Sequence, residues 1–138
     1  MKVYKVVSRA VSEDGRVLSR ISASGSFDMD SNPDEWTLIY KQNEPTLPVI
    51  GKLFAFETED AAHTFVRRCG GSEIWEAETS YAKPAKFVAC ATPDIELFWN
   101  NDTHGMTIPA PKGTMFCNDI TLTKKLWDRS QLKEDSDE

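Results

Sequence analysis

Apolar residues follow strand-like spacing along most of the chain, and residues 50–71 contain the one segment in which the spacing becomes helical. The apolar run 53–56 is too short for a helix and follows Gly51. Beyond it, apolar residues recur three and four positions apart: Ala61, Ala62, Phe65, Val66 and Cys69. The pattern therefore predicts a buried strand that leads directly into one amphipathic helix.

Signals at both ends of this segment support the helix. Thr58 is a suitable N-cap, because its hydroxyl can accept a hydrogen bond from a free N–H of the first turn. Acidic residues in the first turn and basic residues in the last turn suit the helix dipole: Glu59 and Asp60, then Arg67 and Arg68. Gly70 supplies the left-handed residue that often ends a helix.

The rest of the chain alternates in the manner of short strands separated by turns and loops. The expected strands cover residues 2–7, 17–23, 36–40, 74–79, 87–91, 95–99, 115–117 and 120–122. Segments 24–35, 41–49, 81–84 and 100–113 are interpreted as loops or extended connections, since they are rich in Gly, Pro, Asn, Asp or Ser. The prediction is an α+β fold: a single domain over 1–128, with a mostly antiparallel sheet of about eight short strands and one main helix.

A chain of 138 residues is long enough to form one well-buried core. The residues expected to share that core come from the central strand, the helix and three further strands: Phe54, Phe56, Phe65, Val66, Trp75, Leu97 and Ile120. We expect the three cysteines to be buried, reduced thiols, because none is paired at a spacing typical of zinc or redox sites: Cys69, Cys90 and Cys117.

The formal net charge of −6 is divided between the body of the chain and its end. Residues 133–138 carry four acidic side chains and one lysine, so we expect 129–138 to be an acidic, disordered tail. A mildly acidic body does not suit a phosphate backbone, which excludes nucleic acid as the expected partner. No apolar run approaches the ~20 residues that cross a bilayer, so no membrane partner and a cytoplasmic location are expected.

One polar loop is the most suggestive place for binding. Asn101, Asp102 and His104 lie close together there, and Trp36 follows the other long loop. Polar loop residues and an aromatic side chain suit contact with a ligand or a partner protein. The plainer explanation is a turn built from Asn, Asp and Gly, with the tryptophan in the core. One histidine and one carboxylate are too few for a zinc site, so no metal is expected.

An enzymatic alternative comes from a pattern spread over three segments. In order, Arg9, the Ser22-Ala23-Ser24 run and the Glu76-Ala77-Glu78 run match the Arg, Ser-x-Ser and Glu-x-Glu pattern of arginine-type ADP-ribosyltransferases. This resemblance implies an enzyme that acts on NAD, with Arg9, Ser22, Glu76 and Glu78 as its site residues. Strand-edge glutamates that face water are the commoner explanation of such a pattern.

The overall layout also resembles small uncharacterised proteins of bacteria and their phages. The resemblance follows the segments 4–7, 53–56, 61–65, 74–76 and 113–114, together with Tyr40 and Pro48. It implies a stand-alone accessory or interaction protein and assigns no role to any residue. We therefore expect a non-enzymatic protein without a cofactor, which binds a partner protein or small ligand through the loops 24–35 and 100–113.

Overall fold

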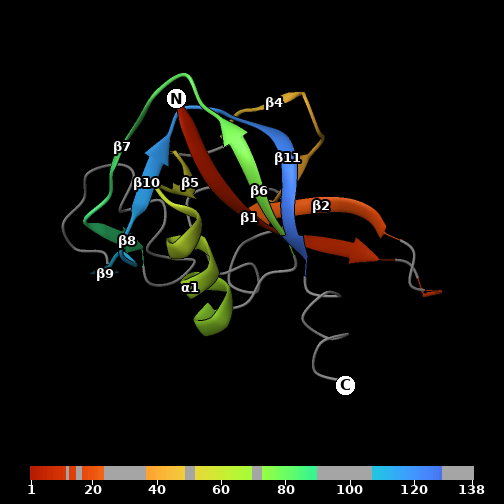
Figure 1. Cartoon of the computed structure of the whole chain (residues 1–138), viewed down its shortest axis with the longest axis horizontal. Coiled ribbons are helices and arrows are strands. Elements are labelled where there is room, and N and C mark those ends of the chain that lie inside the picture. Colours follow the sequence, from red (N-terminus) through yellow and green to blue (C-terminus); the bar gives the residue numbers. More distant parts are fainter. Residues whose placement is uncertain are drawn as a thin grey trace.

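The computed structural model describes residues 1–11, 13–14, 17–23, 37–48, 52–69, 73–89 and 107–128 (Figure 1). Its strands are β1 (Lys2–Val11), β2 (Val17–Ala23), β3 (Thr37–Tyr40), β4 (Pro45–Thr46), β5 (Leu53–Phe56), β6 (Glu73–Glu78), β7 (Ala82–Pro84), β8 (Phe87–Ala89), β9 (Thr107–Pro109), β10 (Thr114–Cys117) and β11 (Ile120–Asp128). The helix of this described part is α1 (Glu59–Cys69).

Seven strands form one antiparallel path in the order β4, β11, β6, β1, β5, β10, β7. The hairpin of β2 and β3 continues from the far end of β1, and β8 pairs with β9 apart from this sheet. In Figure 1, β6 and β11 run side by side, and α1 lies below β5 and β10. An antiparallel sheet with one helix confirms the predicted α+β class.

The pairing of β1 with β6 determines which side chains share a face of the sheet. Lys2 pairs with Glu78, and the register continues without a shift to Val7 and Glu73. Because successive side chains of a strand point to opposite faces, β1 contributes to two separate cores. Val3 and Val7 face one side of the sheet, whereas Val6 faces the other.

Helix α1 covers one of these faces. Phe65 and Val66 on the helix pack with Val6 and Ile74 of the sheet. The rings of Phe56 and Phe65 lie 5.2 Å apart between centroids, a favourable distance for a tilted aromatic pair. The apolar stripe predicted for the helix is therefore the surface that attaches it to the sheet.

The opposite face has a larger core, to which no helix of the described residues contributes. Its members come from β1, β3, β5, β6, β7, β10 and β11, and include Val3, Tyr40, Leu53, Ala55, Trp75, Ile120 and Leu122. Phe54 belongs to neither of these cores, since it packs with Phe116 in a third cluster. The expectation of one common core is thus wrong: the sheet separates Trp75 and Ile120 from Phe56, Phe65 and Val66, and Phe54 belongs to the third cluster. Leu97 lies outside the described residues.

Several strands were missed, or have other bounds than the sequence predicted. The segments expected to be connections at 41–49, 81–84 and 100–113 contain β4, β7 and β9, respectively. β7 pairs with β10, and Pro84 is tolerated there because it lies on an edge strand. β11 reaches Asp128 rather than residue 122, and two register shifts interrupt its pairing with β6.

Some predictions fall on parts of the chain outside this description: the loop 24–35, the strand 95–99, and the tail 129–138. Cys117 is buried and free, as expected, whereas the side chains of Cys69 and Cys90 are not among those described. Within the described ranges, no helix is long and apolar enough to cross a membrane.

Candidate functional site

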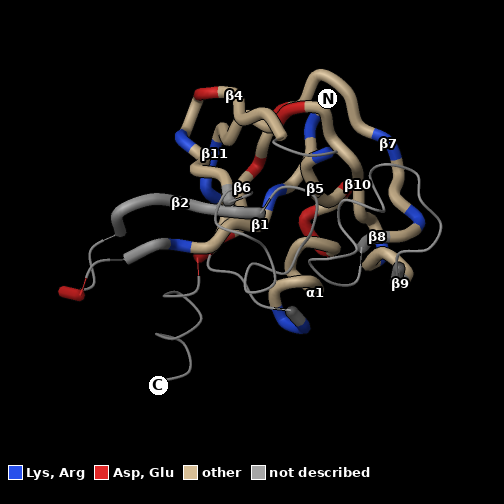
Figure 2. The backbone as a smooth tube through the Cα atoms, turned by 180° about the vertical axis from the view of Figure 1, so that it is seen from behind, with Lys and Arg blue, Asp and Glu red and all other residues tan. Residues whose placement is uncertain are grey.

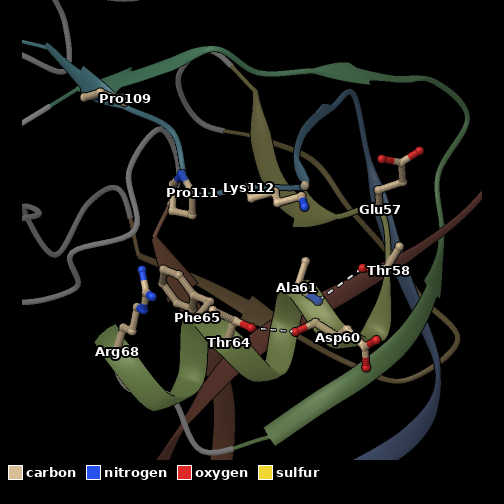
Figure 3. A pocket seen from close by; sticks show the side chains of 11 residues that line it. Glu57, Thr58, Asp60, Ala61, Thr64, Phe65, Arg68, Pro109, Pro111 and Lys112 are labelled. Carbon is tan, nitrogen blue, oxygen red and sulfur yellow. Dashed lines mark hydrogen bonds between the residues drawn. The ribbon is translucent and has the colours of Figure 1, made fainter.

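A groove with a volume of about 770 Å³ lies between α1 and residues 109–113 (Figure 3). We call it the α1 groove. One wall is the helix, which contributes Asp60, Ala61, Thr64, Phe65 and Arg68. The other wall consists of Pro109, Pro111, Lys112 and Gly113, and residues Glu57 and Thr58 line the end next to the start of the helix.

Local hydrogen bonds fix the first turn of the helix wall. The Thr58 hydroxyl accepts a hydrogen bond from the Ala61 N–H at 3.1 Å, as predicted for an N-cap. One turn further on, the Thr64 hydroxyl donates to the Asp60 carbonyl at 3.0 Å. The Phe65 ring is 8% exposed and turns toward Pro111, so the groove has an aromatic floor that also belongs to the core (Figure 3).

Gly113 allows the second wall to approach the helix closely. Its φ of +83° lies in the region that favours glycine, and a Cβ at this position would lie 2.8 Å from the Cβ of Ala61. The Gly113 carbonyl accepts a hydrogen bond from the Glu57 N–H at 2.8 Å. The Thr114 hydroxyl donates to the Pro111 carbonyl at 2.6 Å, which holds the preceding turn. Both walls are therefore fixed by the fold.

Charges of both signs line the groove. Figure 2 shows acidic residues at the start of α1 and basic residues at its end. Of these, Asp60 and Arg68 line the groove, together with Glu57 and Lys112. All four side chains are exposed, so they remain hydrated and available to a ligand. The groove thus combines an apolar floor with a charged rim.

A second unusual cluster lies inside the helix-free core. Lys5 is 3% exposed, and its Nζ donates to the Phe54 carbonyl at 2.7 Å. The same atom lies 5.4 Å from the centroid of the Tyr40 ring. Burial lowers the pKa of Lys5 to about 8, since the interior disfavours the charged ammonium. Burial likewise raises the pKa of the Cys117 thiol to about 11.

The side chains of this cluster are closed off from solvent. Tyr40 is 2% exposed, and burial raises the pKa of its hydroxyl. A substrate would have to open the sheet to reach Tyr40 or Lys5, because both side chains are enclosed. Close by in the same core, the Trp75 Nε1 donates to the Glu73 carboxylate at 2.8 Å, so that buried acid also has a structural partner.

The structure separates the residues of the ADP-ribosyltransferase pattern. Glu76 and Glu78 pair with Tyr4 and Lys2 near the start of β1, whereas Arg9 lies seven residues beyond Lys2, or roughly 23 Å along the strand. The register also places Arg9 on the face opposite the two glutamates, since odd and even residues of β1 point to opposite sides. Ser22 pairs through its backbone with Leu38, near the Arg9 end, and its side chain is outside the description.

Both glutamates are engaged with the start of the chain. The Glu76 carboxylate lies 2.9 Å from the Lys2 ammonium, and the Glu78 carboxylate lies 3.3 Å from the N-terminal amine. The ion pair with Glu76 raises the pKa of Lys2. Arg9 and the glutamates therefore do not converge on one cleft, which the enzymatic alternative requires.

The four predicted binding residues lie outside the described part of the chain: Trp36, Asn101, Asp102 and His104. The loop predicted at 100–113 is nevertheless described from residue 107 onward, and its last residues form one wall of the α1 groove. Among the residues that the structure describes, no group of three or more His, Cys, Asp or Glu side chains could hold a metal ion.

Sequence reasoning missed the main residues of the groove. Phe65 and Arg68 were explained entirely by helix formation, through the apolar stripe and the helix dipole. Pro109, Pro111 and Gly113 indicated only a loop. A possible signal was their close spacing, since two prolines and a glycine within five residues favour a rigid turn rather than a freely variable connection.

Comparison of the chain with protein-family models, curated proteins and solved structures finds no match. The class of the protein therefore rests on its own fold and groove.

Proposed function

We propose that this is a non-enzymatic binding protein that holds a short extended segment of a partner protein in the α1 groove. The observation that carries the proposal is the groove itself, with its volume of about 770 Å³, apolar floor and charged rim. Ligand sites commonly have volumes of about 300–1,000 Å³ and combine apolar walls with a few polar groups. A binding role is also consistent with the class of accessory or interaction proteins that the sequence resemblance implies.

The dimensions of the helix wall favour an extended peptide. Asp60 and Arg68 are eight residues apart on α1, or about 12 Å along the helix axis. An extended chain rises about 3.3 Å per residue, so about four residues would span this length. Phe65 and Pro111 offer apolar contact at the middle of the groove, where a peptide side chain would be shielded from water (Figure 3).

A variant that fills the groove from its exposed edge tests this proposal. Thr64 is exposed on α1 and lines the groove, so Thr64→Trp should fill part of it without entering the core. The wild-type protein is expected to enrich specific members of a displayed library of random eight-residue peptides. Thr64→Trp should reduce binding of the enriched peptides at least about tenfold, because the indole takes the place of the ligand.

The matched control is Arg67→Trp, which adds the same side chain to an exposed helix position that does not line the groove. This variant should bind the enriched peptides as the wild type does. The proposal is overturned if no peptide is enriched, or if both tryptophan variants affect binding equally. Circular dichroism spectra of both variants show whether α1 stays folded.

A further inference from the structure

The two ends of the α1 groove carry opposite charge. Arg68 lies at the end formed by the last turn of the helix, beside Phe65 (Figure 3). Glu57 and Asp60 lie at the other end, and Lys112 is between Pro111 and Glu57. Counting these four groups, the Arg68 end has a charge of +1, and the end with two acids and one lysine has −1.

The apolar middle of the groove keeps these charges apart. Ala61 and Phe65 occupy it on the helix side, and Pro111 faces them from the second wall (Figure 3). The separation of about 12 Å between Asp60 and Arg68 along the helix axis exceeds the Debye length of about 8 Å at physiological salt. Each end therefore attracts a ligand charge largely independently of the other end.

We infer that the α1 groove selects a peptide segment with a basic and an acidic residue four positions apart. This inference rests on the proposed function and adds the chemistry of the ligand. The acidic side chain lies at Arg68, and the basic side chain lies at Glu57 and Asp60. In an extended chain, residues four positions apart point to the same side, so both charged groups can face the groove together.

The lining of the groove also predicts which kind of residue lies between the two charged residues of the ligand. The central residue of the segment points in the same direction as the charged residues, toward Phe65 and Pro111. An apolar side chain at that position is favoured, because it buries surface against an aromatic ring and a proline. The inferred ligand is thus a short segment with one charge at each end and an apolar residue at its centre.

Three labelled peptides with blocked ends test the charge pattern directly. Their central sequences are Lys-Ala-Val-Ala-Glu, Lys-Ala-Val-Ala-Lys and Glu-Ala-Val-Ala-Glu, and binding is followed by fluorescence anisotropy at physiological salt, where the Debye length of about 8 Å keeps the two ends of the groove independent. The mixed-charge peptide should bind wild-type protein at least about fivefold more tightly than either peptide of uniform charge, because each of those places one like charge at an end of the groove.

Arg68→Glu should reverse this preference. The variant makes both ends of the groove acidic, so the peptide with two lysines becomes the tightest ligand, and the mixed-charge peptide loses roughly tenfold in affinity. A gain of affinity for one peptide does not arise from misfolding. Arg67→Glu is the matched control: it reverses a charge on the same helical turn outside the groove, and it should keep the wild-type order of affinities.

Equal binding of the three peptides to the wild type, or the same response to Arg67→Glu and Arg68→Glu, overturns the inference. The peptide library separates this failure from failure of the proposed function. If Thr64→Trp weakens binding of the enriched peptides but these peptides lack the charge pair, the inference on ligand charge is wrong and the groove remains a peptide site. If no peptide depends on Thr64, both the inference and the proposed function fail.

Discussion

Phe65→Ala is expected to lower the free energy of unfolding by ~3–5 kcal/mol, because truncation of a buried ring leaves a cavity. The ring is 8% exposed, packs against Phe56, and joins α1 to the sheet. The control is Phe87→Ala, since Phe87 is 51% exposed and its truncation opens no comparable cavity. Urea denaturation of the three proteins measures the difference.

The control should change the free energy of unfolding by less than about 1 kcal/mol, as surface substitutions commonly do. A similarly small change for Phe65→Ala would show that α1 is not docked on the sheet. Such a result would also remove the helix wall of the α1 groove, since Phe65 forms both the floor of the groove and the contact with the core.

Lys5→Met is expected to stabilise the protein at pH 7 by ~1.5 kcal/mol. Burial lowers the pKa of Lys5 from 10.5 in the unfolded chain to about 8, which costs the folded protein ~3 kcal/mol below pH 8. The variant removes this cost and loses the hydrogen bond from the charged ammonium to the Phe54 carbonyl, worth ~1.5 kcal/mol. The thioether side chain is apolar and of similar length, so it should fill the same space.

The pH dependence of the wild type follows from the same shift. Between pH 8 and pH 9 the unfolded chain binds the Lys5 proton and the folded chain releases it, so stability rises by about 1 kcal/mol. Above pH 9 the raised pKa values of Cys117 and Tyr40 act in the opposite direction, because the unfolded chain then loses protons that the folded chain keeps. Lys5→Met should lack the rise between pH 8 and pH 9. The free energy of unfolding is measured by urea titration at pH 8 and at pH 9. An equal rise in this free energy for both proteins would show that Lys5 is not desolvated as described.

Elements specified by neighbouring residues were predictable from the sequence. The helix matches its prediction, because the Thr58 cap, the charged turns and the apolar stripe all lie within twelve residues. β2 has the expected bounds, since its alternation is uninterrupted. β7 and β9 were missed because each is three residues long, contains a proline, and is defined only by pairing with a distant strand.

The division of the core was less accessible to sequence reasoning. Alternation correctly placed Trp75 and Ala77 on the face opposite Ile74. It gave no indication of which strands become neighbours, so Phe54 and Trp75 were assigned to one core although the sheet lies between them. Strand order depends on pairing over long sequence distances, as between β1 and β6, and a local pattern carries no such information.

The α1 groove could not be predicted for the same reason. Its two walls are separated by about fifty residues of chain and meet where Gly113 packs against Ala61. Both residues had ordinary local explanations, one as a loop glycine and the other as part of a helical stripe. Only the tertiary contact between them turns a helix face and a proline-containing turn into a site.

The location of a bound peptide shows directly whether the α1 groove is the binding site. Isotope-labelled protein is titrated with a peptide enriched from the random library, and backbone amide signals are followed by NMR spectroscopy. Saturable shifts are expected that are largest at Ala61, Thr64, Lys112 and Gly113, on both walls of the α1 groove, and that disappear in Thr64→Trp. Saturable shifts concentrated on the β2–β3 hairpin, with these four amides unchanged, would contradict the proposal that the α1 groove is the binding site.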